Sequence, residues 1–400
     1  MNRLLQKIWQ QSPIVFNHGL RTFILGLGNM VIAVLAIQRI SADFWGSFVP
    51  YLLWMGVGLH IVSWGNKEYL LRSFSNRPEQ EGEEFYRVLC SRLPLLVCFC
   101  ISGLLVFPNP TGLALVLWLL VYFLYQSLDA LVTFRQAFGQ ACIADVIGLS
   151  ILIGAIIFFP ESLDIRCLAL LYALSFLVRF VILLLFLKMP SYRLQDSYLD
   201  FGYYAIALPF LIISLIGMLS SRVDLYTATA VLSKEQIAQY QIITASLGYV
   251  RAAAGILVYS FIKQVYQLSW SASKLWLYRL IALGGLISSV GSLGLYLLTN
   301  WYMGMQLPGS LFFLAIWYVW PAFAITLCVI RLFKLSKERT VIYLSLLNLS
   351  INLILSLILF PRLGLQGGLI AGAIGTTVIA GLHLYLFQKG NSSLNQAEEK

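Results

Sequence analysis

Ionisable side chains are rare within the long apolar runs of this sequence, and each one is a candidate for chemistry. Arg21, Arg179 and Arg251 are basic examples, and Asp129 and Asp224 are acidic ones. A charge at membrane depth costs several kcal/mol unless it is paired or hydrated. A guanidinium group carries a planar set of donors that fits phosphate oxygens. These residue types therefore predict recognition of a negatively charged group.

Six predicted helices each carry polar residues on a single face, when residues are placed 100° apart around the helix. The stripes contain His18, Arg21, Thr22, Leu25 and Asn29; Tyr122, Tyr125, Gln126, Asp129 and Thr133; Tyr172, Ser175 and Arg179; Ser214, Gly217, Ser221 and Asp224; Thr244, Gly248, Arg251 and Gly255; and Ser345, Asn348, Asn352 and Ser356. Together they indicate an aqueous interior with net positive charge. For stripes of Ser, Asn and Gly, the alternative is close helix packing.

The stripes divide into two expected roles. The residues expected to line a substrate cavity are Arg21, Arg179, Arg251, Tyr122, Tyr125 and Asn29. The carboxylates expected to act in gating or ion coupling are Asp129, Asp145 and Asp224. A structural alternative stays open, in which the arginines pair with Asp129 or Asp145 and the tyrosines form an interfacial belt.

Two other arginines are interpreted differently. Arg222 lies about 160° around its helix from Asp224, so the two are not expected to share a site. Arg92 is expected to lie near the inner membrane surface and to extend its head group into water.

Motifs of soluble enzymes are absent from the sequence. There is no Walker A pattern, and His18, His60 and His383 have no metal-binding spacing with Glu. The six cysteines lie in or beside apolar runs, where we interpret them as small buried hydrophobic residues. We therefore expect no catalytic residue, no metal and no cofactor.

The composition is that of an integral membrane protein. Of the 400 residues, 60% are hydrophobic and only 11% are charged, whereas soluble domains carry about 25% charged residues. Runs of about 18 apolar residues span a bilayer as helices. The sequence predicts an all-α fold of about twelve transmembrane helices, at 14–37, 46–64, 88–107, 112–134, 142–160, 167–188, 204–231, 240–262, 276–298, 309–330, 341–360 and 367–387.

Lysine and arginine mark the orientation of these helices. With the N-terminus in the cytoplasm, the outer loops hold only Arg39, Arg166, Lys234 and Arg362, and the inner segments hold most of the others. The positive-inside rule then places both termini in the cytoplasm. The net charge of +10 is explained by these short loops, so we expect no nucleic-acid partner. The longest connection, 65–87, is also expected on the inner side.

A weak internal repeat divides the chain. Short acidic turns follow the first and seventh predicted helices, at 40–46 and 232–240, and a Phe-Pro pair ends the fifth and eleventh, at Phe159 and Phe360. The spacing of about 190–200 residues predicts two parallel six-helix bundles related by a pseudo-two-fold axis. The expected domains are 1–195 and 196–390, followed by a disordered cytoplasmic tail at 391–400.

Three stretches carry a resemblance to a known family. They are Ser41–Gly46 continuing to Leu70-Leu71-Arg72, Ser221–Asp224 continuing through Glu235 to Tyr240, and Asn348–Thr376, which includes Asn352 and Gly367-Gly368. In these features the sequence resembles the polysaccharide-biosynthesis flippases. These are O-antigen and capsule-type transporters of the multidrug/oligosaccharidyl-lipid/polysaccharide exporter superfamily. The likeness is specific over part of the chain and otherwise rests on hydropathy and helix count.

The resemblance implies a function and its partners. It implies a flippase that moves a polyprenyl-diphosphate-linked oligosaccharide from the inner to the outer leaflet by alternating access through a cationic central cavity. It further implies the inner membrane of a bacterium, a proton or sodium ion for coupling, and a polysaccharide polymerase as an associated protein.

Two alternatives to the flippase stay open. A multidrug or metabolite antiporter on the same scaffold would extrude an organic cation, which an arginine-rich cavity disfavours. A membrane-embedded polysaccharide polymerase or glycosyltransferase generally needs a larger outer loop than the chain offers, although Asp43 lies in the first one. On balance, we expect a transporter rather than an enzyme.

Overall fold

Long helices make up the chain. The computed structural model describes residues 2–107, 110–187, 189, 198–259, 269–335 and 337–398. Within these residues no strand occurs, and twelve helical segments are long and apolar enough to cross a membrane. The predicted all-α fold with twelve spans is confirmed, and the chain is a multi-pass membrane protein. The predicted helix ends at 188 and 262 lie outside the described residues.

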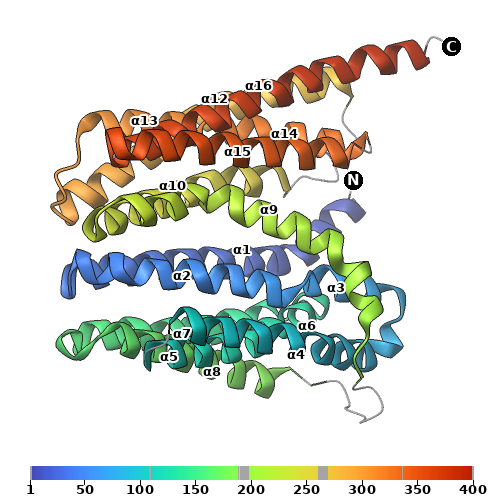
Figure 1. The fold of residues 1–400 in the computed structure, drawn as a ribbon. Helices are drawn as coiled ribbons and strands as arrows, with labels where there is room; N and C mark the ends of the chain where they lie inside the picture. The colour runs from blue at the N-terminus through green and yellow to red at the C-terminus, as the bar shows by residue number, and fades with distance from the viewer. Residues whose placement is uncertain are drawn as a thin grey trace. The chain divides into compact units, whose positions relative to one another are not determined.

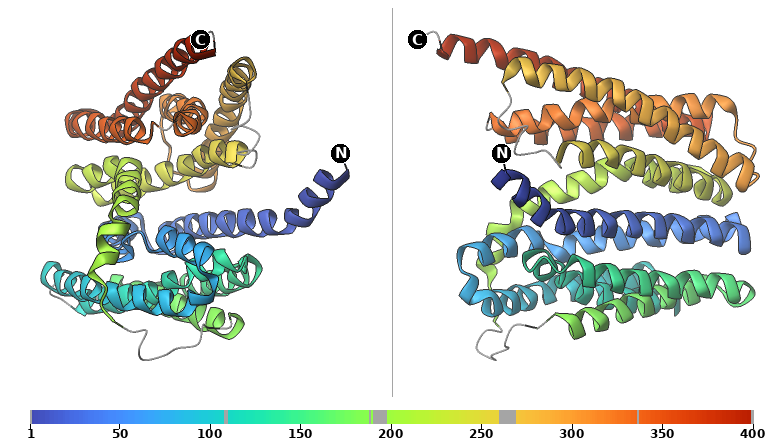
Figure 2. Two further views of the ribbon diagram at one scale, coloured as in Figure 1. Left: turned by 90° about the vertical axis from the view of Figure 1, so that its right-hand side faces the viewer. Right: turned by 180° about the vertical axis from the view of Figure 1, so that it is seen from behind.

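Contacts between helices divide the chain into two compact units, Met1–Leu215 (unit 1) and Ile216–Lys400 (unit 2). The division falls within a continuous helix, α9 (Phe201–Val231), rather than between 195 and 196. Within each unit the spans run side by side, roughly parallel or antiparallel to one another (Figures 1 and 2).

Unit 1 contains the first six spans and the start of α9. Its other elements are α1 (Asn2–Arg39), α2 (Ala42–Ser63), α3 (Asn66–Asn76), η1 (Pro78–Gln80), α4 (Glu81–Val106), α5 (Pro110–Ser127), α6 (Asp129–Phe134), α7 (Phe138–Phe158), η2 (Pro160–Ser162) and α8 (Ile165–Phe186). Helix α5 packs along α8, and α7 packs along both α1 and α8. Phe48, Trp118 and Tyr172 join α2, α5 and α8 through stacked rings with centroids 4.5–6.1 Å apart.

The charged connection expected at 65–87 is helical instead. Trp64 and Gly65 adopt positive φ values of 45° and 67°, which end α2 and redirect the chain into α3. Helix α3 is amphipathic, with Leu70 and Phe74 buried. A hydropathy search detects apolar helices that span the bilayer. Helix α3 is polar overall and need not span it, so such a search misses it.

Unit 2 contains the rest of α9 and the last five spans. Its elements are α10 (Lys234–Tyr259), α12 (Trp270–Tyr296), the π-helical turn η4 (Leu297–Tyr302), α13 (Gly309–Val319), α14 (Pro321–Lys334), α15 (Glu338–Leu363) and α16 (Leu365–Glu398). The tail expected to be disordered at 391–400 is helical as far as Glu398. No proline interrupts α16, and Leu394, Gln396 and Ala397 are good helix formers.

The fourth span of each unit is broken at the same place. Helices α5 and α6 meet at Leu128, and α13 and α14 meet at Trp320, which is 192 residues further along the chain. Pro321 explains the second break because it starts α14 and cannot donate a helical hydrogen bond. The shared break supports the internal repeat, although each of these spans was predicted as one continuous helix.

The α15–α16 hairpin in unit 2 depends on close backbone approach. Gly364 turns the chain with a φ of 55°. A Cβ atom on Gly367 would lie 2.3 Å from the backbone oxygen of Leu359, so any larger residue must push the two helices apart.

Gly367→Ala is therefore expected to destabilise the protein by about 1–3 kcal/mol, the usual cost of overpacking. Gly381→Ala is the matched control in the same helix, because nothing lies within 4 Å of its would-be Cβ atom. Thermal unfolding of both variants in detergent tests this expectation. Equal melting temperatures for the two variants would show that the hairpin is looser than described.

Candidate functional site

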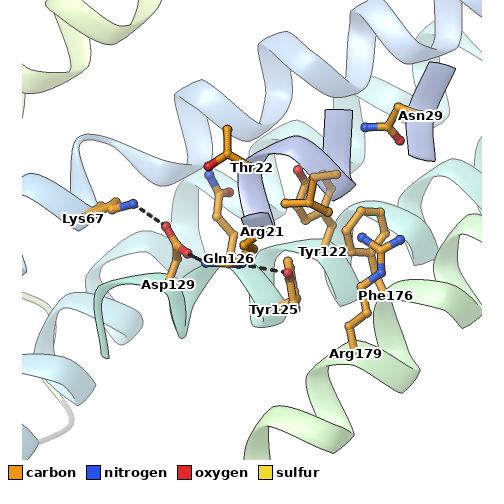
Figure 3. A pocket seen from close by; sticks show the side chains of 11 residues that line it. Arg21, Thr22, Asn29, Lys67, Tyr122, Tyr125, Gln126, Asp129, Phe176 and Arg179 are labelled. Atoms are coloured by element: carbon orange, nitrogen blue, oxygen red, sulfur yellow. Dashed lines mark hydrogen bonds and ion pairs between the residues drawn. The ribbon is translucent and has the colours of Figure 1, made fainter. Parts of the chain in front are cut away.

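A pocket of about 320 Å³ opens among the helices of unit 1 (Figure 3). Its lining residues come from α1, α3, α5, α6 and α8, and they are Arg21, Thr22, Leu25, Asn29, Lys67, Tyr122, Tyr125, Gln126, Asp129, Phe176 and Arg179. Five of the six residues expected to line a substrate cavity are among them, the exception being Arg251. The predicted stripe on the first helix faces this pocket, and the side chain of His18 lies outside the described residues.

Arg21 lies at the centre of the charged groups (Figure 3). Its Nε donates to Asp145 Oδ2 at 2.8 Å, and its Nη1 donates to Asp129 Oδ1 at 2.8 Å. Its Nη2 donates to the Tyr125 hydroxyl at 3.1 Å. All three guanidinium nitrogens thus have acceptors, so the structural pairing left open by the sequence is present at Arg21.

Asp145 is the buried anchor of this network. Its side chain has no exposed surface, and it accepts hydrogen bonds from Arg21 and from the Tyr125 hydroxyl. It lies on α7, which packs against both α1 and α8. Because a buried carboxylate needs paired charge and hydrogen bonds, Asp145 holds the helices that form the pocket wall.

Asp129 connects the network to the open side of the pocket. Its Oδ2 accepts from Lys67 Nζ at 2.7 Å, while its Oδ1 accepts from Arg21. The Lys67 side chain is 39% exposed. The Lys67–Asp129 contact is therefore the most exposed ion pair of the network, and pairs near solvent contribute little free energy.

Arg179 is the least satisfied cation of the pocket. Its Nη1 is 3.7 Å from Asp145 Oδ1, which is too far for a good hydrogen bond, and its buried Nε has no partner. The guanidinium carbon lies 4.6 Å from the centre of the Phe176 ring. Three cations and two carboxylates therefore lie at this site. The guanidinium of Arg179 has hydrogen-bond donors that no acceptor satisfies.

Gly148 provides the room for Arg179. A Cβ atom there would lie 2.2 Å from Arg179 Nε and 2.5 Å from its Cγ. Gly148→Ala is expected to displace Arg179 and to weaken anion binding several-fold. Gly154→Ala is the control on the same helix, because its would-be Cβ meets nothing within 4 Å. Equal affinity of the two variants for inorganic pyrophosphate would exclude this role for Gly148.

The remaining predicted site residues lie in unit 2. Asp224 is buried and accepts from the Tyr240 hydroxyl at 2.8 Å and from the Leu225 amide. The guanidinium carbon of Arg251 lies 5.4 Å from the centre of the Tyr318 ring. Its Nη1 lies 3.5 Å from the Tyr318 hydroxyl. Neither Asp224 nor Arg251 lines the pocket of unit 1.

One interpretation from the sequence was wrong, and two contributors to the pocket were missed. Arg92 does not extend into water: it is 1% exposed, donates to Ser127 Oγ, and lies over the Phe123 ring. Lys67 was assigned to a loop, although its place directly after the Trp64-Gly65 turn marks a helix start. Phe176 gave no signal of its own, because an aromatic residue in an apolar helix is usually part of the core.

No group of three or more His, Cys, Asp or Glu side chains suited to a metal ion occurs in the described part of the chain. The site contains instead a chain of alternating charges, Lys67–Asp129–Arg21–Asp145–Arg179. Such an arrangement of side chains suits the binding of charged groups.

The fold that carries this site is similar to the fold of proteins of known structure. No family model matches the sequence, and no curated protein matches it. Among solved structures, the lipid II flippase MurJ in an inward-closed conformation has a TM-score of 0.65 at 12% identity, covering 93% of this chain and 87% of MurJ. An inward-facing multidrug-resistance MATE family transporter of the MOP superfamily has a TM-score of 0.60 at 14% identity, with 95% and 99% covered.

A MOP superfamily transporter from Pyrococcus furiosus, described as having a binding pocket of reversed polarity, has a TM-score of 0.57 at 14% identity, with 96% and 95% covered. At these identities the likeness establishes the fold and does not assign a substrate. The chain therefore shares, over nearly its whole length, the twelve-helix fold of MOP superfamily transporters and of the flippase MurJ.

Proposed function

We propose that this protein is a flippase that carries a polyprenyl-diphosphate-linked oligosaccharide from the inner to the outer leaflet of a bacterial plasma membrane, with both termini in the cytoplasm. The pocket of unit 1 receives the diphosphate. The distribution of lysine and arginine supports the orientation, and the likeness to MurJ supports transport of a lipid-linked substrate.

The observation that carries the proposal is the excess of donors at the pocket. Among the lining residues, Arg21, Lys67 and Arg179 face two carboxylates, and the single ion pair of Arg179 is long, at 3.7 Å. A diphosphate supplies several oxygens in one small group, which suits the guanidinium of Arg179 and the ammonium of Lys67. Asn29 and Gln126 add neutral donors to the lining of the same pocket.

Ion coupling follows from the same charges in this proposal. A diphosphate that takes Lys67 away from Asp129 leaves that carboxylate with Arg21 alone. Its side chain is 23% exposed, so a proton or sodium ion can reach it. Asp129 is thus the proposed site where an ion gradient acts on substrate binding.

A multidrug antiporter is the second candidate, because several structures of similar fold are MATE transporters. Its binding site would use Asp129 and Tyr122 to hold an organic cation. The presence of three cationic side chains at the pocket opposes this use, since they would repel such a ligand.

Leaflet exchange in proteoliposomes distinguishes the two functions. We expect purified protein to expose a fluorescent polyprenyl-diphosphate-linked sugar to a membrane-impermeant quencher faster than empty vesicles do. We also expect it not to accumulate a lipophilic organic cation under a proton or sodium gradient. Cation accumulation without exchange of the lipid would refute the flippase and favour the antiporter.

A further inference from the structure

The helix ends on one side of unit 2 form a basic rim, which consists of Trp270, Lys274, Arg331, Lys337 and Arg339. These residues lie at the start of α12, at the end of α14 and at the start of α15. We propose that the basic rim, centred on Arg331, binds the phosphate of an anionic phospholipid. The inference concerns a lipid of the surrounding bilayer, so it does not depend on the substrate proposed above.

The basic rim lies at the level of lipid head groups. Trp270 begins the span Trp270–Tyr302, and Lys334 ends the span Gly309–Lys334. Lys274 is four residues from the first of these ends and Arg331 three residues from the second, or about 4–6 Å along each helix axis. The interfacial layers of a bilayer are about as thick as this, and tryptophan is enriched there. A lipid phosphate therefore reaches Arg331 without leaving the bilayer.

Arg331 lies where α12, α14 and α16 meet, and its own contacts are weak. Its guanidinium carbon is 5.4 Å from the centre of the Trp270 ring, and its Nη1 is 3.5 Å from Ser273 Oγ. The Trp270 ring packs on Phe387 of α16, with centroids 4.5 Å apart. Arg331 is only half-buried. A ring contact and one long hydrogen bond thus position this guanidinium, and most of its N–H groups stay open to a further acceptor.

Acidic side chains do not balance the charge of the basic rim. From 269 to 279 and from 331 to 339 the sequence contains six basic residues and one acid, Glu338. No carboxylate lies within 4 Å of Arg331 or Lys274 among the side chains that the structure describes.

The equivalent helix ends of unit 1 are different. At the start of α4, Glu81 pairs with Arg135 at 2.8 Å. Arg87 pairs with Glu84, and its Nε lies 3.6 Å from Asp200 Oδ2. The cations of unit 1 are thus neutralised by its own acids, whereas those of the basic rim require an external anion.

An anionic phospholipid has the chemistry that this surface requires. A guanidinium binds phosphate oxygens through paired donors. Lys274, Lys337 and Arg339 are exposed and add to the attraction of a negatively charged head group. Leu275 and Phe333 are exposed next to these cations in the sequence and offer apolar surface to the acyl chains. A zwitterionic lipid gains less, because its own cation offsets the phosphate charge.

Binding of defined phospholipids to the purified full-length protein tests the proposal. Native mass spectrometry from a neutral detergent measures how much phosphatidylglycerol or phosphatidylcholine, with identical acyl chains, the protein retains. We expect the wild type to bind phosphatidylglycerol about tenfold more tightly, which corresponds to about 1.4 kcal/mol. Inorganic phosphate at the same concentration should not displace this lipid, because it has no acyl chains to hold it at the rim.

Two variants and a control locate the preference. Arg331→Gln is expected to remove most of the tenfold difference between the two lipids. Lys274→Gln changes an exposed side chain and should weaken binding of phosphatidylglycerol about fivefold, or about 1 kcal/mol. Arg362→Gln removes an exposed arginine at the opposite end of α15 in the same unit, and should leave the preference unchanged.

Equal affinity of the wild type for the two phospholipids would overturn the proposal. A preference that survives in Arg331→Gln, or that Arg362→Gln reduces as much, would do the same. If Arg331→Gln does not fold, an unchanged preference in Lys274→Gln decides against the site. Displacement of phosphatidylglycerol by inorganic phosphate would show that the ligand is a free anion rather than a lipid.

Discussion

Asp145→Ala is expected to destabilise the protein by about 3–5 kcal/mol, the usual cost of removing one partner of a buried ion pair. The Asp145 side chain is fully buried and accepts from both Arg21 and Tyr125. Its loss leaves Arg21 Nε and the Tyr125 hydroxyl without acceptors and removes the only carboxylate within 4 Å of Arg179 among the described residues. Thermal unfolding in detergent should show the largest decrease of any single change in unit 1.

Two comparisons test this explanation. Glu161→Gln changes an exposed carboxyl group in η2 and is expected to leave the melting temperature unaltered. In the double variant Asp145→Asn with Arg21→Gln, the loss should be smaller than the sum of the two single losses, because both changes break one pair. Additive losses, or wild-type stability of Asp145→Ala, would show that the network does not hold the helices together.

Arg179→Gln is expected to reduce transport of a polyprenyl-diphosphate-linked sugar by about ten- to a hundredfold. One charge-assisted hydrogen bond to phosphate accounts for this range, at about 1.5–3 kcal/mol. Arg179 has the weakest pairing of the three pocket cations, a single ion pair of 3.7 Å through Nη1, so its guanidinium has the most to offer an incoming oxygen. Initial rates of leaflet exchange in proteoliposomes measure the effect.

Arg179 is expected to matter for substrate recognition and to contribute little to the stability of the fold. Arg179 makes one long ion pair, so Arg179→Gln should unfold close to the wild-type temperature. Arg179→Lys should restore only part of the transport rate, because an ammonium group lacks the planar, paired donors of a guanidinium group. Arg77→Gln, on the exposed end of α3, serves as the control. Normal exchange by Arg179→Gln at equal protein levels would exclude Arg179 from substrate binding.

The spans were predictable because lipid leaves few alternatives to a long apolar helix. The predicted helix boundaries were wrong where a polar stretch of the sequence forms a helix. Helix α4 begins at Glu81, seven residues before its predicted start at 88, since Glu81–Arg87 lowers the local hydropathy. Helix α3 was missed for the same reason. The start and end of a helix outside the hydrocarbon layer depend on capping and on neighbouring helices, which hydropathy does not report.

The faces of the pocket were predictable, and its pairings were not. Tyr122, Tyr125 and Asp129 line one pocket because they share one helix face. The rotation of about 100° between successive residues continues across the short break at Leu128. Which acid meets Arg21 depends on how α1, α5 and α7 pack, and the sequence left two alternatives. The burial of Arg92 depends on the rings and hydroxyl of α5 that cover it, including Phe123 and Ser127.

Binding of bare polyprenyl diphosphate to the purified protein tests the central claim most directly. We expect this lipid to raise the melting temperature of the wild type, because a ligand that binds only the folded state stabilises it. We expect Arg179→Gln to lose most of this increase, and an organic cation such as tetraphenylphosphonium to produce none. Stabilisation by the organic cation, with no effect of the diphosphate lipid, would contradict the account.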